Sequence, residues 1–489
     1  DNNTAIGHQS LQLNTTGLSN TAVGSFALTF NQTGSYNTAT GLQALYTNSS
    51  GINNTAFGYA ALLSNLTGNS NTAIGLDTLR NNTTGSGNVA AGYQSLKLNT
   101  TGIGNVATGY QALELNTTGG SNTATGYQAL LSNETGNSNT AAGYQALLSN
   151  LADDNSAFGY QALLNNTTGV SNSAVGYDAL SSNLTGGGNT ATGHEALLSN
   201  ETGNSNTATG SQALNANLAD NNSAFGFRAL LSNTEGTANT ATGYAALSSN
   251  LTGDANTAVG SFALGLNETG TANTATGYQA LESNLADENS AFGYQALFEN
   301  TTGSGNTATG YQALELNSTG EKNTATGYQS LQLNTTGVHS VAVGCFALQT
   351  NNGDSNTAVG FDSLVSSNTG NKNVALGCEA GANITSGSSN IMIGFSVTAQ
   401  SATADDQLNI GNWIYGVNGD IGIGVAAPTA KLDVDGEINA TSFKVTAMNT
   451  APASASDTGT LGEIRIVADF IYVCIATNTW VRSALVTWP

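Results

Sequence analysis

The chain has 489 residues and a formal net charge of -22, with 8% charged residues, 60 glycines and 3 prolines. Average globular chains carry roughly a quarter charged residues and about 5% proline, so this is not the composition of several ordinary globular domains. The nine Lys and Arg residues form no stripe, which excludes nucleic-acid partners and anionic membrane surfaces. No apolar run approaches the ~20 residues of a membrane helix, so we expect no membrane insertion.

A short pattern, clearest in Asn-Thr-Ala-Thr-Gly-Tyr-Gln-Ala-Leu at 122–130, recurs from Asn3 to the degenerate copy at Asn390. There are 24 copies at a nearly constant spacing, as from Asn105 to Asn122, and we call each copy a coil. A fixed short period predicts a solenoid or a fibre, and disordered chains have no need for one. In the clearest coil, the residues expected to define the repeat are Asn122, Ala124, Gly126, Tyr127 and Leu130.

The first arm of each coil, Asn-Thr-Ala-x-Gly, predicts a short β-strand. The x position takes Ile, Val, Thr or Phe, which are strand formers. Alternation along a strand places Thr and x on one face and Ala on the other, against a wall where only a methyl group fits. Gly ends the strand in every copy, which indicates a corner with positive φ or a close backbone approach.

The second arm, Tyr-Gln-Ala-Leu-Leu-Ser-Asn, allows two interpretations. Ala and Leu dominate it, which suits a helical turn or an extended arm chosen for side-chain volume. Helices need about 8–10 Å between their axes, whereas stacked strands lie about 4.8 Å apart. The arm is therefore extended, or strands from other chains interleave and lengthen the rise of each coil. We favour the extended arm.

The segment that closes each coil, Asn-x-Thr-Gly, has turn chemistry. Asn and Gly both tolerate left-handed backbone conformations. Stacked in register, the Asn side chains would form ladders like those of other stacked β structures. These segments also match the glycosylation acceptor pattern, but every coil needs the turn whether or not a sugar is attached.

Four spacings are a residue shorter than the others, and they end at Asn155, Asn222, Asn289 and Asn356, which lie 67 residues apart each time. A block of four coils therefore repeats in tandem, as expected of a spacer whose length is set by duplication. The acids ahead of three of these coils, such as those at 153 and 154, fit turn positions better than a calcium site.

The cysteines of the repeats are not expected to form a disulfide. Cys345 and Cys378 occupy the same position two coils apart. The strand spacing places them about 10 Å apart, which is too far for a disulfide bond.

Each coil offers only Ala, Leu, the x residue and an aromatic residue for burial. That is a thin core for about 17 ordered residues, each of which costs about 1.5 kcal/mol of conformational entropy. We therefore expect an apolar lateral face that other copies of the chain cover, most simply in a parallel homotrimer. The predicted fold class is an all-β, repetitive β-solenoid or β-roll fibre with a small C-terminal β module.

These coils resemble the Ser-Val-Ala-Ile-Gly head repeats of trimeric autotransporter adhesins, most closely at Ser340-Val-Ala-Val-Gly344. They are also similar to repeats of phage and bacterial tail-fibre proteins. The resemblance covers about four fifths of the chain, and it implies a trimeric, extracellular rod on a virion surface or a cell-surface appendage. The chain begins almost inside a coil, so we expect a mature fragment or a segment whose anchor lies elsewhere.

The composition shifts after Gly394, because all three Pro and all three Trp residues lie beyond it. Residues 408–415 alternate, and Asn418-Gly419 predicts a hairpin turn. The following Gly-Ile-Gly and Lys-Leu-Asp-Val-Asp-Gly436 motif resembles the segment before the tip of many tail fibres. A hairpin turn is also expected at Asp435-Gly436. The predicted parts are a shaft of 24 coils at 1–394, a β transition segment at 395–446 and a β cap at 447–489.

The last residues predict two or three strands, with turns at Ala468-Asp469 and near Thr477-Asn478, and they resemble C-terminal β modules of phage virion proteins. Aromatic and Arg side chains are favoured at binding hot spots, so their concentration at one end indicates a receptor contact. The alternative is that they form the core of a small trimeric cap. The candidate binding residues are Tyr472, Trp480, Arg482 and Trp488.

No catalytic constellation, metal-ligand cluster or phosphate loop is apparent, so we expect no enzymatic activity, metal or cofactor. The sequence predicts a structural fibre that extends a C-terminal tip for attachment to a host or surface. Its partners would be further copies of itself and a cell-surface receptor or glycan. Two alternatives are an ice-binding solenoid, suggested by recurring Thr-Ala-Thr, and a glycan-binding solenoid with sites along the shaft.

Overall fold

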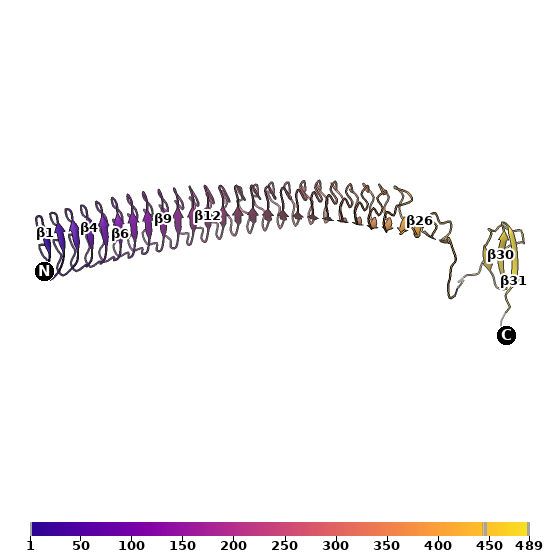
Figure 1. The fold of residues 1–489 in the computed structure, drawn as a ribbon, viewed down its shortest axis with the longest axis horizontal. Helices are drawn as coiled ribbons and strands as arrows, with labels where there is room; N and C mark the ends of the chain where they lie inside the picture. The colour runs from indigo at the N-terminus through magenta and orange to yellow at the C-terminus, as the bar shows by residue number, and fades with distance from the viewer. Residues whose placement is uncertain (1, 443, 445–446, 487–489) are drawn as a thin grey trace.

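The computed structural model describes residues 2–442, 444 and 447–486, and all regular structure in these residues is β, with no helix. Figure 1 shows a long, gently curved rod in which each coil contributes one short strand, followed by a linker and a small separate sheet. This confirms the predicted all-β solenoid of about 24 turns with a small antiparallel C-terminal sheet.

The strands of the shaft are three residues long and pair in parallel with the strands of the coils before and after, as in Thr4↔Thr21 and Thr123↔Thr140. Their bounds are β1 (Thr4–Ile6), β2 (Thr21–Val23), β3 (Thr38–Thr40), β4 (Thr55–Phe57), β5 (Thr72–Ile74), β6 (Val89–Ala91), β7 (Val106–Thr108), β8 (Thr123–Thr125), β9 (Thr140–Ala142), β10 (Ser156–Phe158), β11 (Ser173–Val175), β12 (Thr190–Thr192), β13 (Thr207–Thr209), β14 (Ser223–Phe225), β15 (Thr240–Thr242), β16 (Thr257–Val259), β17 (Thr274–Thr276), β18 (Ser290–Phe292), β19 (Thr307–Thr309), β20 (Thr324–Thr326), β21 (Val341–Val343), β22 (Thr357–Val359), β23 (Val374–Leu376) and β24 (Ile391–Ile393).

The middle residue of each strand points into the coil, and the first and third residues point out. From β2 to β23 the middle Ala has no exposed surface, as at Ala124, whereas Thr123 and Thr125 are exposed. The alternation predicted for the first arm is therefore confirmed. Alanine suits this fully buried position, where a larger side chain would overpack the interior of a typical coil.

The interior of a coil differs from the predicted core. The x residue and the aromatic residue were expected to be buried, but both face outward, as with Phe158 and the 42% exposed Tyr127. Two Ala, one Leu and two Asn fill a typical coil instead, for example Ala124, Ala129 and Leu130 with two buried asparagines. A single chain therefore buries its own core. The expectation of a trimer, as far as it rested on a core too small for one chain, is not supported by this interior.

The buried asparagines form two ladders along the shaft. Before each strand, the Asn122 backbone N–H donates to the side-chain oxygen of Asn105 (2.9 Å), and the Asn122 amide donates to Gly136 O (2.8 Å). In the closing turn, the Asn133 amide donates to Asn116 Oδ1 (3.1 Å) and to Gly136 O (2.8 Å). The sequence predicted the ladder of the closing turn but not the one before each strand, and both satisfy turn backbone groups that no strand partner reaches.

The second arm is not helical. The N–H of Gln128 donates to Tyr110 O in the preceding coil (2.9 Å), and the N–H of Leu130 donates to Ala146 O in the following coil (3.0 Å). Gln128 and Leu130 have φ of 55° and 53°, so left-handed residues bend the arm around the Ala129 side chain. Bonds between coils hold the arm, together with i→i−3 bonds such as that from Asn133 N to Leu130 O (3.3 Å), and the bonds between coils keep every coil at the strand spacing.

The Gly after each strand makes the predicted corner. Gly126 has φ of 134°, and a Cβ atom placed on it would lie 2.3 Å from the carbonyl oxygen of Gly143 in the next coil. The corners therefore stack backbone on backbone, which only glycine permits.

Beyond the shaft, four strands extend the same sheet, and three form a second one. The extension is β25 (Leu408–Ile410), β26 (Ile414–Val417), β27 (Asp420–Ile423) and β28 (Leu432–Val434). Asn418 and Gly419, with φ of 54° and 81°, make the predicted hairpin turn between β26 and β27. The hairpin expected at Asp435-Gly436 is wrong, because β28 pairs in parallel with β27 and no antiparallel strand follows it in the extension among the described residues.

The stacked corner predicts a sharp difference between two nearby glycines on either side of Asn189. Gly193→Ala should destabilise the surrounding coils by about 1–3 kcal/mol, because its φ is 138° and the new Cβ would lie 2.5 Å from Gly210 O. The loss should appear as faster hydrogen exchange in that coil and its two neighbours, because each coil contacts only the next.

Gly187→Ala is the matched control, because its Cβ would lie 3.3 Å from the nearest atom and other coils carry side chains at this position. Equal protection in the two variants would refute the close-packed corner.

The turn ladder predicts the cost of losing one amide. Asn133→Leu keeps the number and branching of the side-chain heavy atoms but removes the acceptor used by the Asn150 amide and the donor that reaches Asn116 Oδ1. Each buried group left without a partner costs about 1–3 kcal/mol, so chemical denaturation should show a loss in that range.

The control for Asn133→Leu is Asn137→Ser in the exposed part of the same turn. Ser86 accepts the equivalent bond from Asn69 N (3.0 Å), so this variant should keep wild-type stability. A harmless Asn133→Leu would show that the ladder does not stabilise the shaft.

Candidate functional site

The C-terminal sheet, here called the tip sheet, consists of β29 (Ile464–Ile466), β30 (Phe470–Ala476) and β31 (Thr479–Ala484) in antiparallel order. The turns between these strands lie at the predicted positions. Tyr472 pairs with Arg482 and Cys474 with Trp480, which brings these side chains to one face of the sheet. The residues of the strand-rich C-terminus thus converge because the register sets them opposite one another.

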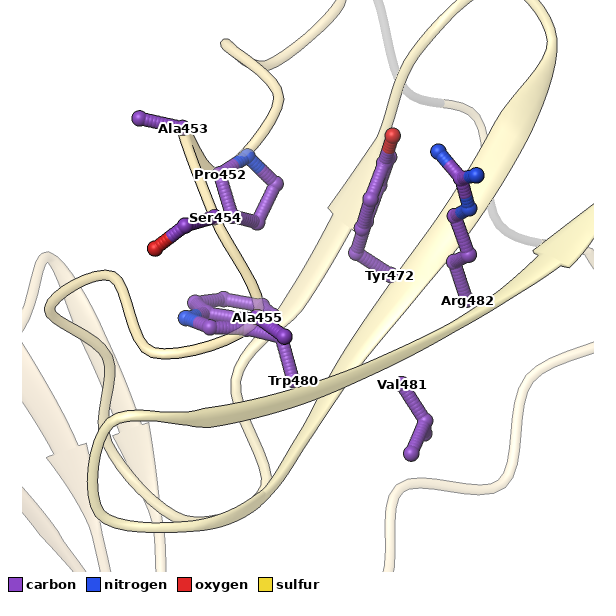
Figure 2. A pocket seen from close by; sticks show the side chains of 8 residues that line it. All are labelled: Pro452, Ala453, Ser454, Ala455, Tyr472, Trp480, Val481 and Arg482. Atoms are coloured by element: carbon purple, nitrogen blue, oxygen red, sulfur yellow. The ribbon is translucent and has the colours of Figure 1, made fainter.

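A pocket of about 420 Å³ opens on this face. Figure 2 shows Tyr472 and Arg482 side by side, Trp480 beneath the segment 452–455, and Val481 pointing the other way. Three of the four predicted tip residues therefore share one pocket, which is lined by Pro452, Ala453, Ser454, Ala455, Tyr472, Trp480, Val481 and Arg482. The fourth predicted residue, Trp488, lies outside the described residues.

Trp480 is the anchor of the tip sheet. Its side chain is only 5% exposed, and its indole N–H donates to Asp457 O (3.1 Å). The guanidinium of Arg465 lies over the indole ring at 4.5 Å, and a Cβ on Gly459 would lie 2.3 Å from the ring. Trp480 therefore holds the segment 455–459 against the sheet, and its role in the pocket is to form the floor.

Asp457 and Arg465 fix the wall of the pocket, and the sequence did not single them out. Asp457 accepts hydrogen bonds from the backbone N–H groups of Ala453 and Thr458, both at 2.9 Å. These bonds, the one from Ala453 foremost, hold the pKa of the Asp457 carboxyl below its ordinary value, and the Arg465 guanidinium adds to the effect. The only sequence signal was a single Asp followed by Thr-Gly, shortly after Pro452.

Arg482 supplies the positive charge of the pocket. Its guanidinium lies 4.6 Å from the centre of the Phe470 ring, and it makes no ion pair with any residue that the structure describes. Arg465, in contrast, is neutralised by Glu463 at 2.7 Å. An uncompensated guanidinium beside the Tyr472 side chain suits a planar anionic group such as a carboxylate.

The repeat residues take structural positions in the shaft. Asn122, Ala124 and Leu130 are fully buried, and Gly126 forms a corner. Tyr127 stacks between Tyr110 and Tyr144, with ring centroids 5.1 Å apart on each side. The stack runs from Tyr93 to His194 and resumes from Tyr278 to Tyr328, so the exposed aromatic rings stiffen one edge of the rod.

Across residues 2–442, 444 and 447–486, no group of three or more His, Cys, Asp and Glu side chains is placed to hold a metal ion. The same residues contain no helix long and apolar enough to cross a membrane. Cys345, Cys378 and Cys474 are free thiols.

Comparisons with protein-family models, with curated proteins and with solved structures found no match to this chain. The class of protein therefore follows from the geometry alone: the chain is a β-solenoid repeat protein with a separate antiparallel tip sheet.

The bonds of Asp457 predict a pH dependence of the tip sheet. Its folded pKa is lowered, so the stability it contributes is present above its unfolded pKa of about 3.9 and is lost as the pH falls through the folded value. Asp457→Asn should therefore destabilise the tip sheet at neutral pH, and the difference from wild type should shrink as the pH falls below about 3.9.

The measurement for this prediction is urea unfolding followed by the NMR signal of the Trp480 indole N–H. Asp469→Asn is the control, because the Asp469 side chain makes no hydrogen bond to the described residues. A difference between Asp457→Asn and wild type that stays constant with pH would contradict the assigned role of the carboxylate.

Proposed function

We propose that this chain is a structural fibre, a rigid rod that extends a C-terminal tip for attachment to a host or surface. The observation that carries the proposal is the unbroken parallel pairing of β1 through β25, in which each coil contacts the next. With each coil adding about 4.8 Å, 24 coils give a shaft of about 115 Å. The shaft pockets beside Asp153, Asp220 and Val365 are more open than the one in the tip sheet, which suits a spacer.

Several features agree with stiffness. The two asparagine ladders, the stacked tyrosines and the stacked glycine corners all run along the axis, so bending the shaft must strain many short contacts at once. A rod of this kind sets the distance between whatever holds one end and whatever the other end touches. The proposal includes no catalysis and no cofactor, nucleic acid or membrane-inserted segment.

We place the rod outside the cell, on a virion or a cell-surface appendage, as the resemblance to tail fibres and adhesins implies. Its partners in this proposal are further copies of itself, in a homotrimer, and a cell-surface receptor or glycan at the tip. The pocket with the uncompensated Arg482 supports an acidic saccharide as the attachment ligand, because a guanidinium can hold a sugar carboxylate by two parallel bonds.

A water-ordering solenoid is the second candidate. The outward residues of β8, β12 and β13 are all Thr, which gives pairs of hydroxyl groups at regular spacing. Large side chains interrupt the array, among them Phe158, Phe225 and Phe292, each more than 40% exposed. These interruptions favour the fibre.

The attachment proposal predicts a charge-specific loss of binding. On an array of immobilised saccharides, Arg482→Ala in the full chain should reduce binding to carboxylated glycans at least about tenfold, the effect of removing one charge-assisted contact worth ~1.4 kcal/mol or more. Arg228→Ala removes a shaft cation that bonds Gln212, and it should bind as wild type does.

Electron microscopy of the same preparations measures the shaft. A rigid particle of about 115 Å is expected, and a flexible or globular particle would overturn the rod. Binding that survives Arg482→Ala would remove the pocket as the attachment site while leaving the rod intact.

A further inference from the structure

The outward residues of the shaft strands form a face without charge. We define the outer sheet face as the first and third residues of β1–β24, from Thr4 and Ile6 to Ile391 and Ile393. Every one of these positions holds Thr, Ser, Val, Ile, Ala, Leu or Phe. The neighbouring row, which contains Tyr127 and its equivalents, also carries no Asp, Glu, Lys or Arg.

The charges of the repeats lie on the other rows. Between Asn3 and Gly394 the chain has 21 acidic residues and 5 Lys or Arg residues. They fall in the second arm, as with Asp178 and Glu282, or in the closing turn, as with Glu134 and Asp254. In a chain of net charge -22, a face that stays uncharged through 24 coils indicates that charge is incompatible with what this face contacts.

The outer sheet face also exposes large apolar side chains. Phe57 is 58% exposed and Ile74 47%, and Val175, Val259 and Val359 are about as exposed as the phenylalanines of the four-coil blocks. Monomeric soluble proteins rarely leave apolar patches of more than a few hundred Å² in contact with water. This face continues along the whole rod, so leaving it exposed to water would be unfavourable.

We infer that the outer sheet face binds a second copy of this chain, aligned along the shaft. A second copy has the same coil spacing, so every coil can meet a coil over the full length of the rod, whereas a partner with another period loses register after a few coils. Its own face is equally uncharged, and acids on the remaining rows would repel a copy that approached from any other side.

The four-coil block favours a second copy of the chain over a flat crystalline surface as the partner of this face. Phe158, Phe225 and Phe292 project at the same position in three successive blocks. In each of those coils the first strand residue is the smaller Ser, and these serines are Ser156, Ser223 and Ser290. A second copy presents the same large and small positions at the same intervals and can interdigitate with them, but an ice plane or a crystalline polysaccharide cannot.

This inference rests on the proposed fibre and specifies which surface joins its copies. The test places charge on the outer sheet face of the full chain with Thr192→Glu and Thr242→Glu. Both residues are exposed and lie at strand ends, so folding should be retained. The matched control is Thr167→Glu and Thr234→Glu, in the turn row where Glu134, Glu201 and Glu268 occur naturally and where both neighbours of each new Glu are Leu.

Sedimentation equilibrium measures the mass of each protein. We expect wild type and the control to sediment at a multiple of 49.2 kDa, and the face variant to associate at least about tenfold more weakly, because facing like charges in a desolvated interface disfavour association. Circular dichroism should match in all three proteins.

Two results would overturn the inference. One is a wild-type protein that sediments as a single 49.2 kDa chain throughout the micromolar range, and the other is an assembly that the face variant leaves unchanged. Thermal hysteresis that the monomeric wild type shows and the face variant lacks would assign the face to ordered water. In each case a particle of about 115 Å would keep the proposed rod, so the two proposals fail separately.

Discussion

The close stacking of coils at the strand spacing is the constraint on which the rest of this structure depends. At about 4.8 Å, each residue lies against its equivalent in the next coil, as Thr123 does against Thr140, so each position of the coil becomes a column along the rod. Each residue type in a column must therefore be able to pack against the equivalent residue of the next coil. Gly126 does so as bare backbone, Ala124 as a methyl group, and the asparagines as amides that both donate and accept.

That constraint explains an interior unlike that of a globular domain. The interior has little room for large side chains, so Leu is the only large one in a typical coil, and buried amides hold the corners that apolar contact would hold elsewhere. The outward columns are not limited by the interior volume, and they differ in residue type: some carry acids, one carries aromatic rings, and those of the outer sheet face are uncharged. The buried columns of Gly, Ala, Leu and Asn hold the shaft together. The proposed recognition lies in the outward columns and in the tip sheet.

The tip sheet follows a different logic. It is short and has no repeat. The buried Trp480, the Arg465 guanidinium stacked on it and the hydrogen bonds of Asp457 hold it together instead. The sequence indicated Tyr472, Trp480 and Arg482 from their residue types, but the wall at 452–455 comes from a segment well upstream of them. Only folding brings that segment over the sheet, and no local sequence pattern predicts this packing.

The sequence by itself determined the period, the strand, its inward Ala, the glycine corner and the asparagine ladder of the closing turn, because each is a column that repetition makes visible. It did not predict the second ladder, which the Asn before each strand forms. It favoured an extended second arm over a helical turn but did not settle the choice, since Ala and Leu occur in both. The rise between coils decided it, through bonds such as that from Leu130 N to Ala146 O. It also misplaced the x residue and Tyr127, because apolar type alone does not say which side of a wall a side chain occupies. The tertiary structure settled that, since a coil this narrow has no interior volume for them.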